Sequence, residues 1–125
     1  MTVALDSWAV LRWLEGTEPV AARVDAAIAD AAMSWINVGE VFYVVWRSSG
    51  EDVARRTVTD LRSVVAFDEA TSERVLAAAR IKAEFPMALG DAFAAATAIA
   101  LNAPLLTGDP ELIGRDGPWR VEDLR

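Results

Sequence analysis

Two acidic residues, Asp91 and Asp109, stand near the two ends of an apolar stretch at residues 89–110. Nearly every residue between them is apolar or small, so these carboxylates do not belong to a solvated charged face. The pattern places Asp91 in the first turn of a helix and Asp109 just past the end of a strand. This arrangement suits chemistry that needs carboxylates held at the edge of a core.

Two further acids occupy comparable positions earlier in the chain. Asp6 directly follows a short apolar run at residues 3–5, and Glu40 follows a second run at residues 32–36. Each has a simple structural explanation, because Asp6 can be a helix N-cap and Asn37 with Glu40 has the spacing of a capping box. Four acids at equivalent junctions are harder to explain by capping alone. We therefore also consider a shared site in which Glu40 points across the sheet edge toward Asp6.

The sequence contains neither cysteine nor histidine. This excludes disulfides, zinc sites built on those residues, histidine acid–base catalysis and Ser-His or Cys-His nucleophiles. Carboxylates, hydroxyls, arginines and one lysine remain for chemistry. A metal bound by such residues is a hard cation with oxygen ligands, so we expect Mg²⁺, with Mn²⁺ as a substitute.

The chain has 125 residues and a net charge of −7. The length predicts one domain spanning residues 1–125. The charge argues against a protein that coats nucleic acid nonspecifically, although bound cations would change the sign of the field around an acidic cluster. No apolar run suits a membrane span and no signal-peptide pattern opens the chain, so we expect a cytoplasmic protein without membrane contact.

Strand-like and helix-like segments alternate along the chain. Expected strands lie at residues 3–5, 32–36, 64–67, 103–107 and 119–121, and expected helices at residues 8–14, 18–28, 41–46, 51–62, 72–82 and 90–102. The helix at 41–46 is expected to be buried. The alternation predicts an α/β fold with a mostly parallel central sheet of four to five strands flanked by helices. Ligands bind such sheets at the carboxyl ends of the strands, which is where Asp6, Glu40 and Asp109 fall.

Four motifs resemble, in order and spacing, those of PIN-domain ribonucleases: Leu5-Asp6-Ser7, Asn37-Val38-Gly39-Glu40-Val41, residues 90–98, and Leu106-Thr107-Gly108-Asp109-Pro110. The closest likeness is to the VapC toxins of bacterial VapBC toxin–antitoxin pairs, and it covers essentially the whole chain. The resemblance implies a PIN-like fold whose acidic residues meet in one cleft. This chain departs from the family in having Gly90 where alanine or another small residue is common, and in lacking a basic surface.

The implied activity is Mg²⁺- or Mn²⁺-dependent hydrolysis of RNA phosphodiester bonds by the toxin of a type II toxin–antitoxin pair. Matching the motifs residue by residue gives the catalytic acids and two supporting hydroxyls: Asp6, Glu40, Asp91 and Asp109, with Ser7 and Thr107. We hypothesise that Asp6, Asp91 and Asp109 hold the metal directly or through water. Glu40 is then either a further ligand or a base that orients the attacking water.

The resemblance also implies partners: an RNA substrate, a small antitoxin whose segment covers the cleft, and a second copy of the chain in a homodimer. Five tryptophans are many for this length, and Trp8, Trp13, Trp35 and Trp46 fall on apolar stretches. We expect most of them in the core. A subset is a candidate to line an exposed groove for the antitoxin or for the second copy.

Two other functions compete with the ribonuclease. An aspartate-nucleophile phosphohydrolase would have a second Asp two residues after the nucleophile, but Trp8 occupies that place after Asp6. It would also need a Lys in the site, and the one lysine, Lys82, lies in mid-helix with no motif beside it. The second alternative is a catalytically silent binding module whose acids only cap helices. Metal-dependent stabilisation would separate that module from the enzyme.

Overall fold

The computed structural model describes residues 2–125 and contains one five-stranded sheet, in which all the strands are parallel. The strand order is β3-β2-β1-β4-β5. The strands are β1 Val3–Leu5, β2 Ala31–Ser34, β3 Ala66–Asp68, β4 Leu105–Thr107 and β5 Val121–Asp123. The predicted α/β class and parallel sheet are confirmed, and the carboxyl ends of β1, β2 and β4 therefore lie at one edge.

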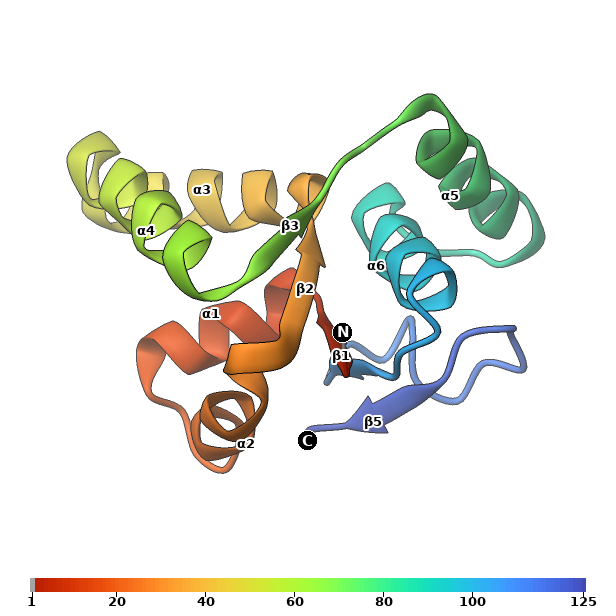
Figure 1. The fold of residues 1–125 in the computed structure, drawn as a ribbon, viewed down its shortest axis with the longest axis horizontal. Helices are drawn as coiled ribbons and strands as arrows, with labels where there is room; N and C mark the ends of the chain where they lie inside the picture. The colour runs from red at the N-terminus through yellow and green to blue at the C-terminus, as the bar shows by residue number, and fades with distance from the viewer. Residues whose placement is uncertain (1) are drawn as a thin grey trace.

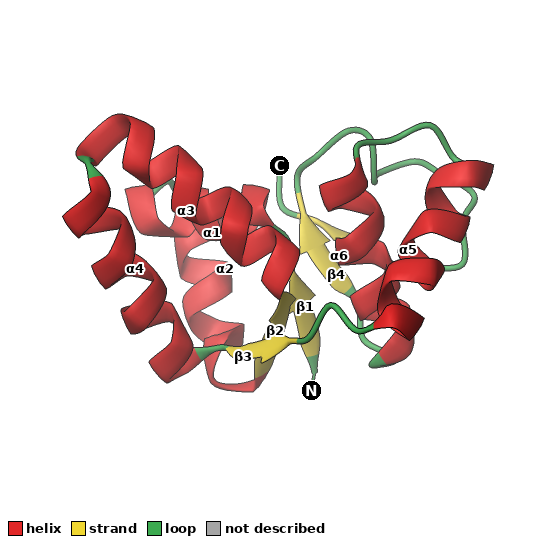
Figure 2. Cartoon of the chain, turned by 90° about the horizontal axis from the view of Figure 1, so that it is seen from above, coloured by secondary structure: helices red, strands yellow, loops and turns green. Residues whose placement is uncertain are grey.

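Helices flank the sheet on both faces. Four helices, α1 to α4, gather on one side of the strands, and α5 and α6 lie on the other (Figures 1 and 2). Their bounds are α1 Ser7–Glu15, α2 Val20–Ala27, α3 Trp35–Ser49, α4 Glu51–Val64, α5 Ser72–Glu84 and α6 Leu89–Ala100, with a short 3₁₀ turn η1 at Ile28–Asp30. No helix within residues 2–125 combines the length and the apolar character that crossing a bilayer requires.

The sheet separates two hydrophobic cores, because alternate residues of a strand face opposite sides. Val3 and Leu5 of β1 pack in the core beneath α1 to α4, whereas Ala4 between them packs in the core with α5 and α6. The second core is built mainly from the small residues of α6, such as Ala94 and Ala95. Small side chains let α6 approach the sheet closely, which brings its N-terminal turn to the carboxyl edge of the strands.

The segment after β2 differs from the prediction. The strand ends at Ser34, whose hydroxyl caps α3 by accepting from the backbone N–H of Ile36, and the helix begins at Trp35. Trp35 and Ile36 are therefore helical, although their bulk favours strands. Asn37 is not the N-cap and the capping-box interpretation of Glu40 is wrong, because both residues lie within α3 and not at its start. Their side chains do not cap the helix and can make other contacts.

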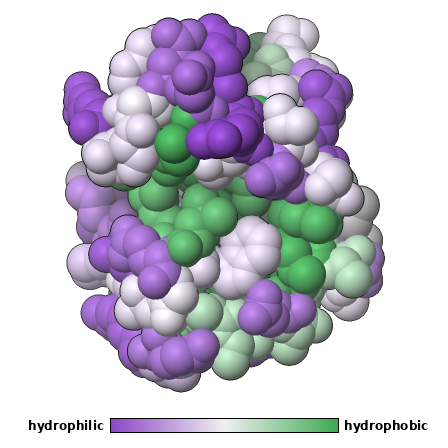
Figure 3. All heavy atoms as spheres, turned by 90° about the vertical axis from the view of Figure 1, so that its left-hand side faces the viewer, coloured by the Kyte–Doolittle hydropathy of each residue, from purple (hydrophilic) through white to green (hydrophobic). Residues whose placement is uncertain are grey.

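The expected burial of residues 41–46 is also wrong. Val41 is fully buried, but Tyr43, Val44 and Trp46 are exposed because α3 extends beyond the sheet. On the face seen in Figure 3, apolar side chains form a patch with a hollow in it. α1 and α4 add Leu14 and Val64 to the exposed apolar residues of this half of the molecule.

The tryptophans are less buried than expected. Trp119 is buried, whereas Trp8, Trp13 and Trp35 are half-buried and Trp46 is exposed. Trp35 lines a groove of about 430 Å³ between α3 and α4, together with Val38, Gly39, Phe42, Arg55, Val58 and Thr59. Trp8, Trp13 and Trp35 still pack against the core and Trp119 lies within it, so the expectation that most tryptophans belong to the core is confirmed in part, with Trp46 as the exception. A tryptophan-lined groove also exists.

Other boundaries shift by one or a few residues. β3 begins at Ala66 because α4 continues to Val64, and β4 begins at Leu105 and not at residue 103. β5 lies at Val121–Asp123 and not at 119–121, and α6 spans Leu89–Ala100. Trp119 precedes β5 and donates its indole N–H to the carbonyl of Leu112. The tryptophan closes the loop after β4 and does not belong to the strand.

Candidate functional site

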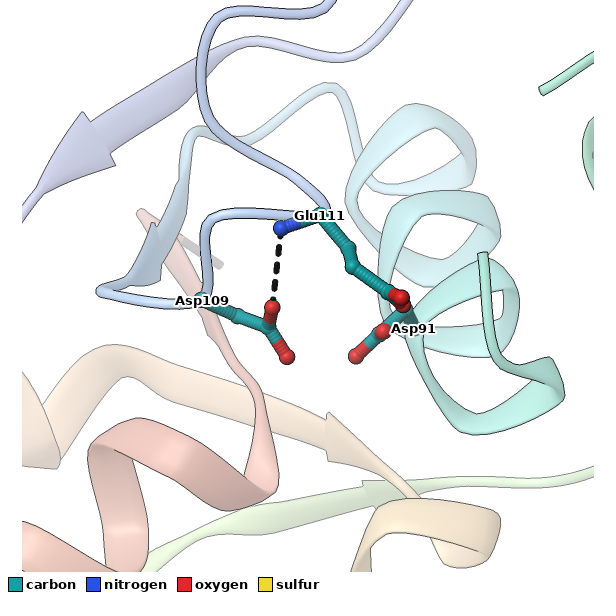
Figure 4. Close-up of side chains that lie close together, drawn as sticks. All are labelled: Asp91, Asp109 and Glu111. Carbon is teal, nitrogen blue, oxygen red and sulfur yellow. Dashed lines mark hydrogen bonds between the residues drawn. The ribbon is translucent and has the colours of Figure 1, made fainter. Parts of the chain in front are cut away.

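Three carboxylates converge at the sheet edge beyond β4: those of Asp91, Asp109 and Glu111. One oxygen from each lies within 4.8 Å of the other two. Asp91 comes from the first turn of α6, while Asp109 and Glu111 come from the loop after β4 (Figure 4). The start of α6 and the loop after β4 therefore present their acids to one point.

Backbone hydrogen bonds fix this cluster. Oδ1 of Asp109 accepts from the N–H of Glu111 at 2.9 Å, which closes a tight turn and places the two side chains near each other. Oε2 of Glu111 accepts from the N–H of Ala88 at 3.0 Å. Ala88 precedes α6 and offers no side-chain cap, so Glu111 satisfies one of the free donors at the start of the helix.

The electrostatics of the cluster are unfavourable for three full negative charges. The pKa of Asp91 is raised to about 8, first by its removal from water and then by its hydrogen bond with Glu111 and the nearby charge of Asp109. The pKa of Glu111 is lowered, first by the same hydrogen bond from Asp91. In the absence of a cation, Asp91 therefore keeps a proton near neutral pH and shares it with Glu111.

Asp6 lies deeper, at the carboxyl end of β1, and only 2% of it is exposed. Its Oδ1 accepts from the N–H of Ala9 at 2.8 Å, so the expected N-cap role is confirmed. The pKa of Asp6 is raised to about 7, chiefly by burial and also by the charges of Asp109 and Glu40, against the lowering effect of its hydrogen bonds. A cap alone does not require so much burial beside two other acids.

Thr107 links the buried acid to the cluster. Its hydroxyl donates to Oδ2 of Asp6 and accepts from the backbone N–H of Asp109 at 3.0 Å. The threonine is fully buried at the end of β4. Its position agrees with the supporting role that the sequence resemblance implies, because it fixes Asp6 and the start of the Asp109 turn together.

Glu40 approaches from α3 on the other wall of the site. Its Oε1 accepts from the hydroxyl of Ser7 at 3.0 Å and from Nδ2 of Asn37 at 2.7 Å. Ser7 follows Asp6 directly, and the charge of Glu40 acts on the pKa of Asp6. The expectation that Glu40 points across the sheet edge toward Asp6 therefore agrees with its contacts.

The structure brings all the predicted acids to one edge but groups them in two sets. Asp91 and Asp109 meet Glu111, whereas Asp6 and Glu40 lie beside them. Ser7, next to Asp6 in the chain, donates to Glu40, and Thr107 donates to Asp6. Sequence reasoning missed Glu111. The Asp109-Pro110 pair is typical of a turn closed on the N–H of residue 111, but the contact of Glu111 with Ala88 has no local signal in the sequence.

A PIN domain model matches residues 3–117 of the chain. A search of curated proteins found no sequence relative. Among solved structures, the DNA-bound VapBC complex from Salmonella typhimurium has a chain that matches with a TM-score of 0.82 and 18% identity, covering 100% of this chain and 99% of that one.

Two further structures show the same fold. VapBC-1 from nontypeable Haemophilus influenzae matches with a TM-score of 0.75 and 22% identity, covering 99% of this chain and 98% of that one. VapC20 of Mycobacterium tuberculosis, described as a toxin that cleaves the sarcin-ricin loop, matches with a TM-score of 0.73 and 17% identity, covering 89% of this chain and 92% of that one. With the family model spanning nearly the whole sequence, the chain belongs to the PIN domain family.

Proposed function

We propose that this chain is a divalent-metal-dependent ribonuclease that acts as the toxin of a toxin–antitoxin pair. The observation that carries the proposal is the convergence of five carboxylates at one sheet edge of a protein without histidine or cysteine. Membership of the PIN family and the likeness to VapBC structures support it.

The donor set suits Mg²⁺ or Mn²⁺. Two ligands on opposite sides of an octahedral Mg²⁺ are about 4.2 Å apart, given bond lengths of about 2.1 Å. The oxygens of Asp91, Asp109 and Glu111 lie within 4.8 Å of one another, so small side-chain rotations bring them to that geometry. We propose Asp91 and Asp109 as direct ligands, with Asp6 acting directly or through water.

A bound Mg²⁺ would lower the pKa of a water molecule and offset the charge that develops on the phosphate oxygens. The chain itself orients that water through Glu40. Both hydrogen bonds from Ser7 and Asn37 go to Oε1 of Glu40, which leaves Oε2 to accept a proton or to complete the ligand set. Thr107 donates to the carboxylate of Asp6 and holds it facing Asp109 and the cluster.

The remaining expectations stay proposals. We propose a single catalytic domain over residues 1–125, an antitoxin segment that covers the acidic cleft, and a cytoplasmic location where RNA is available. A homodimer is supported by the exposed apolar residues Leu14, Val44 and Trp46, which would lose contact with water on association. Light scattering of the purified chain tests the dimer.

The function is tested by incubating the purified protein with a pool of single-stranded RNA of randomised sequence. Cleavage in Mn²⁺ or Mg²⁺, its loss in EDTA, and its loss in Asp91→Asn are the expected results. Attack by water and not by the ribose 2′-hydroxyl predicts products without 2′,3′-cyclic phosphate. A parent protein that binds no metal and cuts no RNA would favour the silent binding module.

A further inference from the structure

We infer that Asn37 is a positioning residue that holds the carboxylate of Glu40 in the cleft and locks it to the helix that carries Asp91. The inference rests on the proposed function, because its consequence is a loss of RNA cleavage. It adds to the acidic set a buried amide that is neither charged nor a cap.

Both hydrogens of the Asn37 side-chain amide form hydrogen bonds within the site. Nδ2 donates to Oε1 of Glu40 at 2.7 Å and to the carbonyl of Gly90 at 3.0 Å. Gly90 is the neighbour of Asp91 in the first turn of α6. One side chain on α3 therefore sets the distance between an acid on its own helix and an acid on α6.

The carboxylate of Glu40 also fills the space beside Gly90. A Cβ placed on Gly90 would lie 2.6 Å from Cδ of Glu40 and closer still to Oε2. Such approach is below any ordinary contact distance, so even alanine at this position would push the carboxylate aside. The glycine therefore leaves room for the carboxylate of Glu40 in the position where Asn37 holds it.

The energetics of Asn37 indicate a role beyond packing. The residue is 1% exposed, and its Oδ1 is buried without a hydrogen bond from any of residues 2–125. A buried, unsatisfied oxygen destabilises the fold, and an apolar residue of similar size would avoid that cost. The amide is therefore best explained by its two donors, which hold Glu40 and Gly90 in place.

Two substitutions disturb the carboxylate by different routes. Asn37→Asp keeps the shape but replaces the donor with an acceptor, and Gly90→Ala fills the space that the carboxylate occupies. Each should lower kcat for the randomised RNA pool in Mn²⁺ by roughly tenfold to a hundredfold, as expected for a reacting group displaced by about 1 Å. KM should stay within about twofold, because the changes alter the position of Glu40 and not the binding of RNA.

The decisive comparison repeats both substitutions in a Glu40→Gln background, with single-turnover kinetics at enzyme excess to resolve low rates. If Asn37 acts through Glu40, neither substitution should lower the remaining rate further. Matched controls are Gly39→Ala, whose added Cβ meets open space on α3, and Asn102→Asp, which adds a charge beyond the far end of α6. Both controls should cleave like the parent.

Stability gives a second readout that needs no RNA. A double-mutant cycle between Asn37→Ala and Glu40→Ala in urea, which removes the donor and the acceptor without creating a new pair, should show a coupling of about tenfold in the unfolding equilibrium constant. A parent that cleaves while Asn37→Asp and Gly90→Ala cleave equally well would overturn the inference alone. Equal losses with and without Glu40 would also overturn it, whereas a parent that cleaves nothing in any metal would overturn the proposed function first.

Discussion

Replacing the buried Asp6 with asparagine should stabilise the metal-free protein at neutral pH. Asp6 is 2% exposed and its pKa rises from 3.8 to about 7 in the folded state, chiefly because of burial. The folded protein therefore holds a proton on Asp6 at pH values where the unfolded chain has lost it. Stability from this group is fully present below about pH 4 and falls as the pH rises to about 7.

The size of the effect follows from that pKa. A change from 3.8 to about 7 corresponds to roughly 4 kcal/mol above pH 7, at about 1.4 kcal/mol for each pH unit. Relaxation and water entry reduce this, so about 2 kcal/mol is expected. Asparagine can still accept from Ala9 and donate to Thr107, so the cap survives the loss of charge. With an unfolding entropy of about 0.26 kcal/mol/K for 125 residues, the Tm should rise by about 8 °C.

The assay is thermal unfolding in EDTA from pH 4.5 to pH 8.5, read as the Tm of Asp6→Asn minus that of the parent. Subtraction removes the contribution of the carboxylates that both proteins share. The difference in Tm should be small at pH 4.5, grow toward pH 7 and then level off, following the ionisation of Asp6. Asp60→Asn, on the exposed face of α4, should give a difference that hardly changes with pH. A pH-independent difference for Asp6→Asn would refute the assignment of a buried, proton-binding acid.

Three further outcomes follow from the site and the sheet. Mn²⁺ at about a hundred times its Kd should stabilise the parent by about 2.7 kcal/mol, seen as a rise in Tm that Asp91→Asn loses; an equal rise in both proteins would remove Asp91 from the ligand set. Glu111→Gln should weaken Mn²⁺ binding measured by titration calorimetry, and unchanged affinity would show that Glu111 only caps α6. Gly108→Ala should destabilise the fold by roughly 1 to 3 kcal/mol in urea, since its Cβ would lie 2.6 Å from Cζ3 of Trp8; an unchanged midpoint would contradict that packing.

Much of this fold could be predicted because local signals and global alternation agree. Gly16 ends α1 in a left-handed conformation with φ 71°, and Thr71 caps α5, as their residue types suggest. The prediction for the start of α3 is wrong because two nearby residues can serve as its N-cap. Ser34 and Asn37 are both good N-caps, and only the length of the strand paired with β1 decides for Ser34.

The residues of the site also divide into those that the sequence predicts and those that it does not. Asp6, Asp91 and Asp109 could be placed because each follows a strand or opens a helix, and the sheet brings those points together. Glu111 depends on a turn closed by Asp109 and on the free N–H of Ala88, which the sequence does not reveal. The pairing of Asn37 with α6 is longer in range still, and no local pattern predicts it.

The silent binding module can be weighed against these contacts. That alternative requires every acid to be explained by capping, and it explains Asp6 and the turn at Asp109. Asp91 fits less well, because α6 is entered through Ala88 without a side-chain cap and the free N–H there is taken by Glu111. A helix N-terminus favours one negative charge, yet burial, and after it the two neighbouring carboxylates, raise the pKa of Asp91 to about 8.

The phosphohydrolase alternative needs a lysine beside the nucleophilic aspartate. Asp6 is buried and accepts from Ala9 and Thr107, and none of its hydrogen bonds within residues 2–125 comes from a lysine. Lys82 donates instead to the carbonyl of Met87. Carboxylates that are crowded beyond what capping requires, and that repel one another without a counter-charge, are best explained by a cation that they bind together.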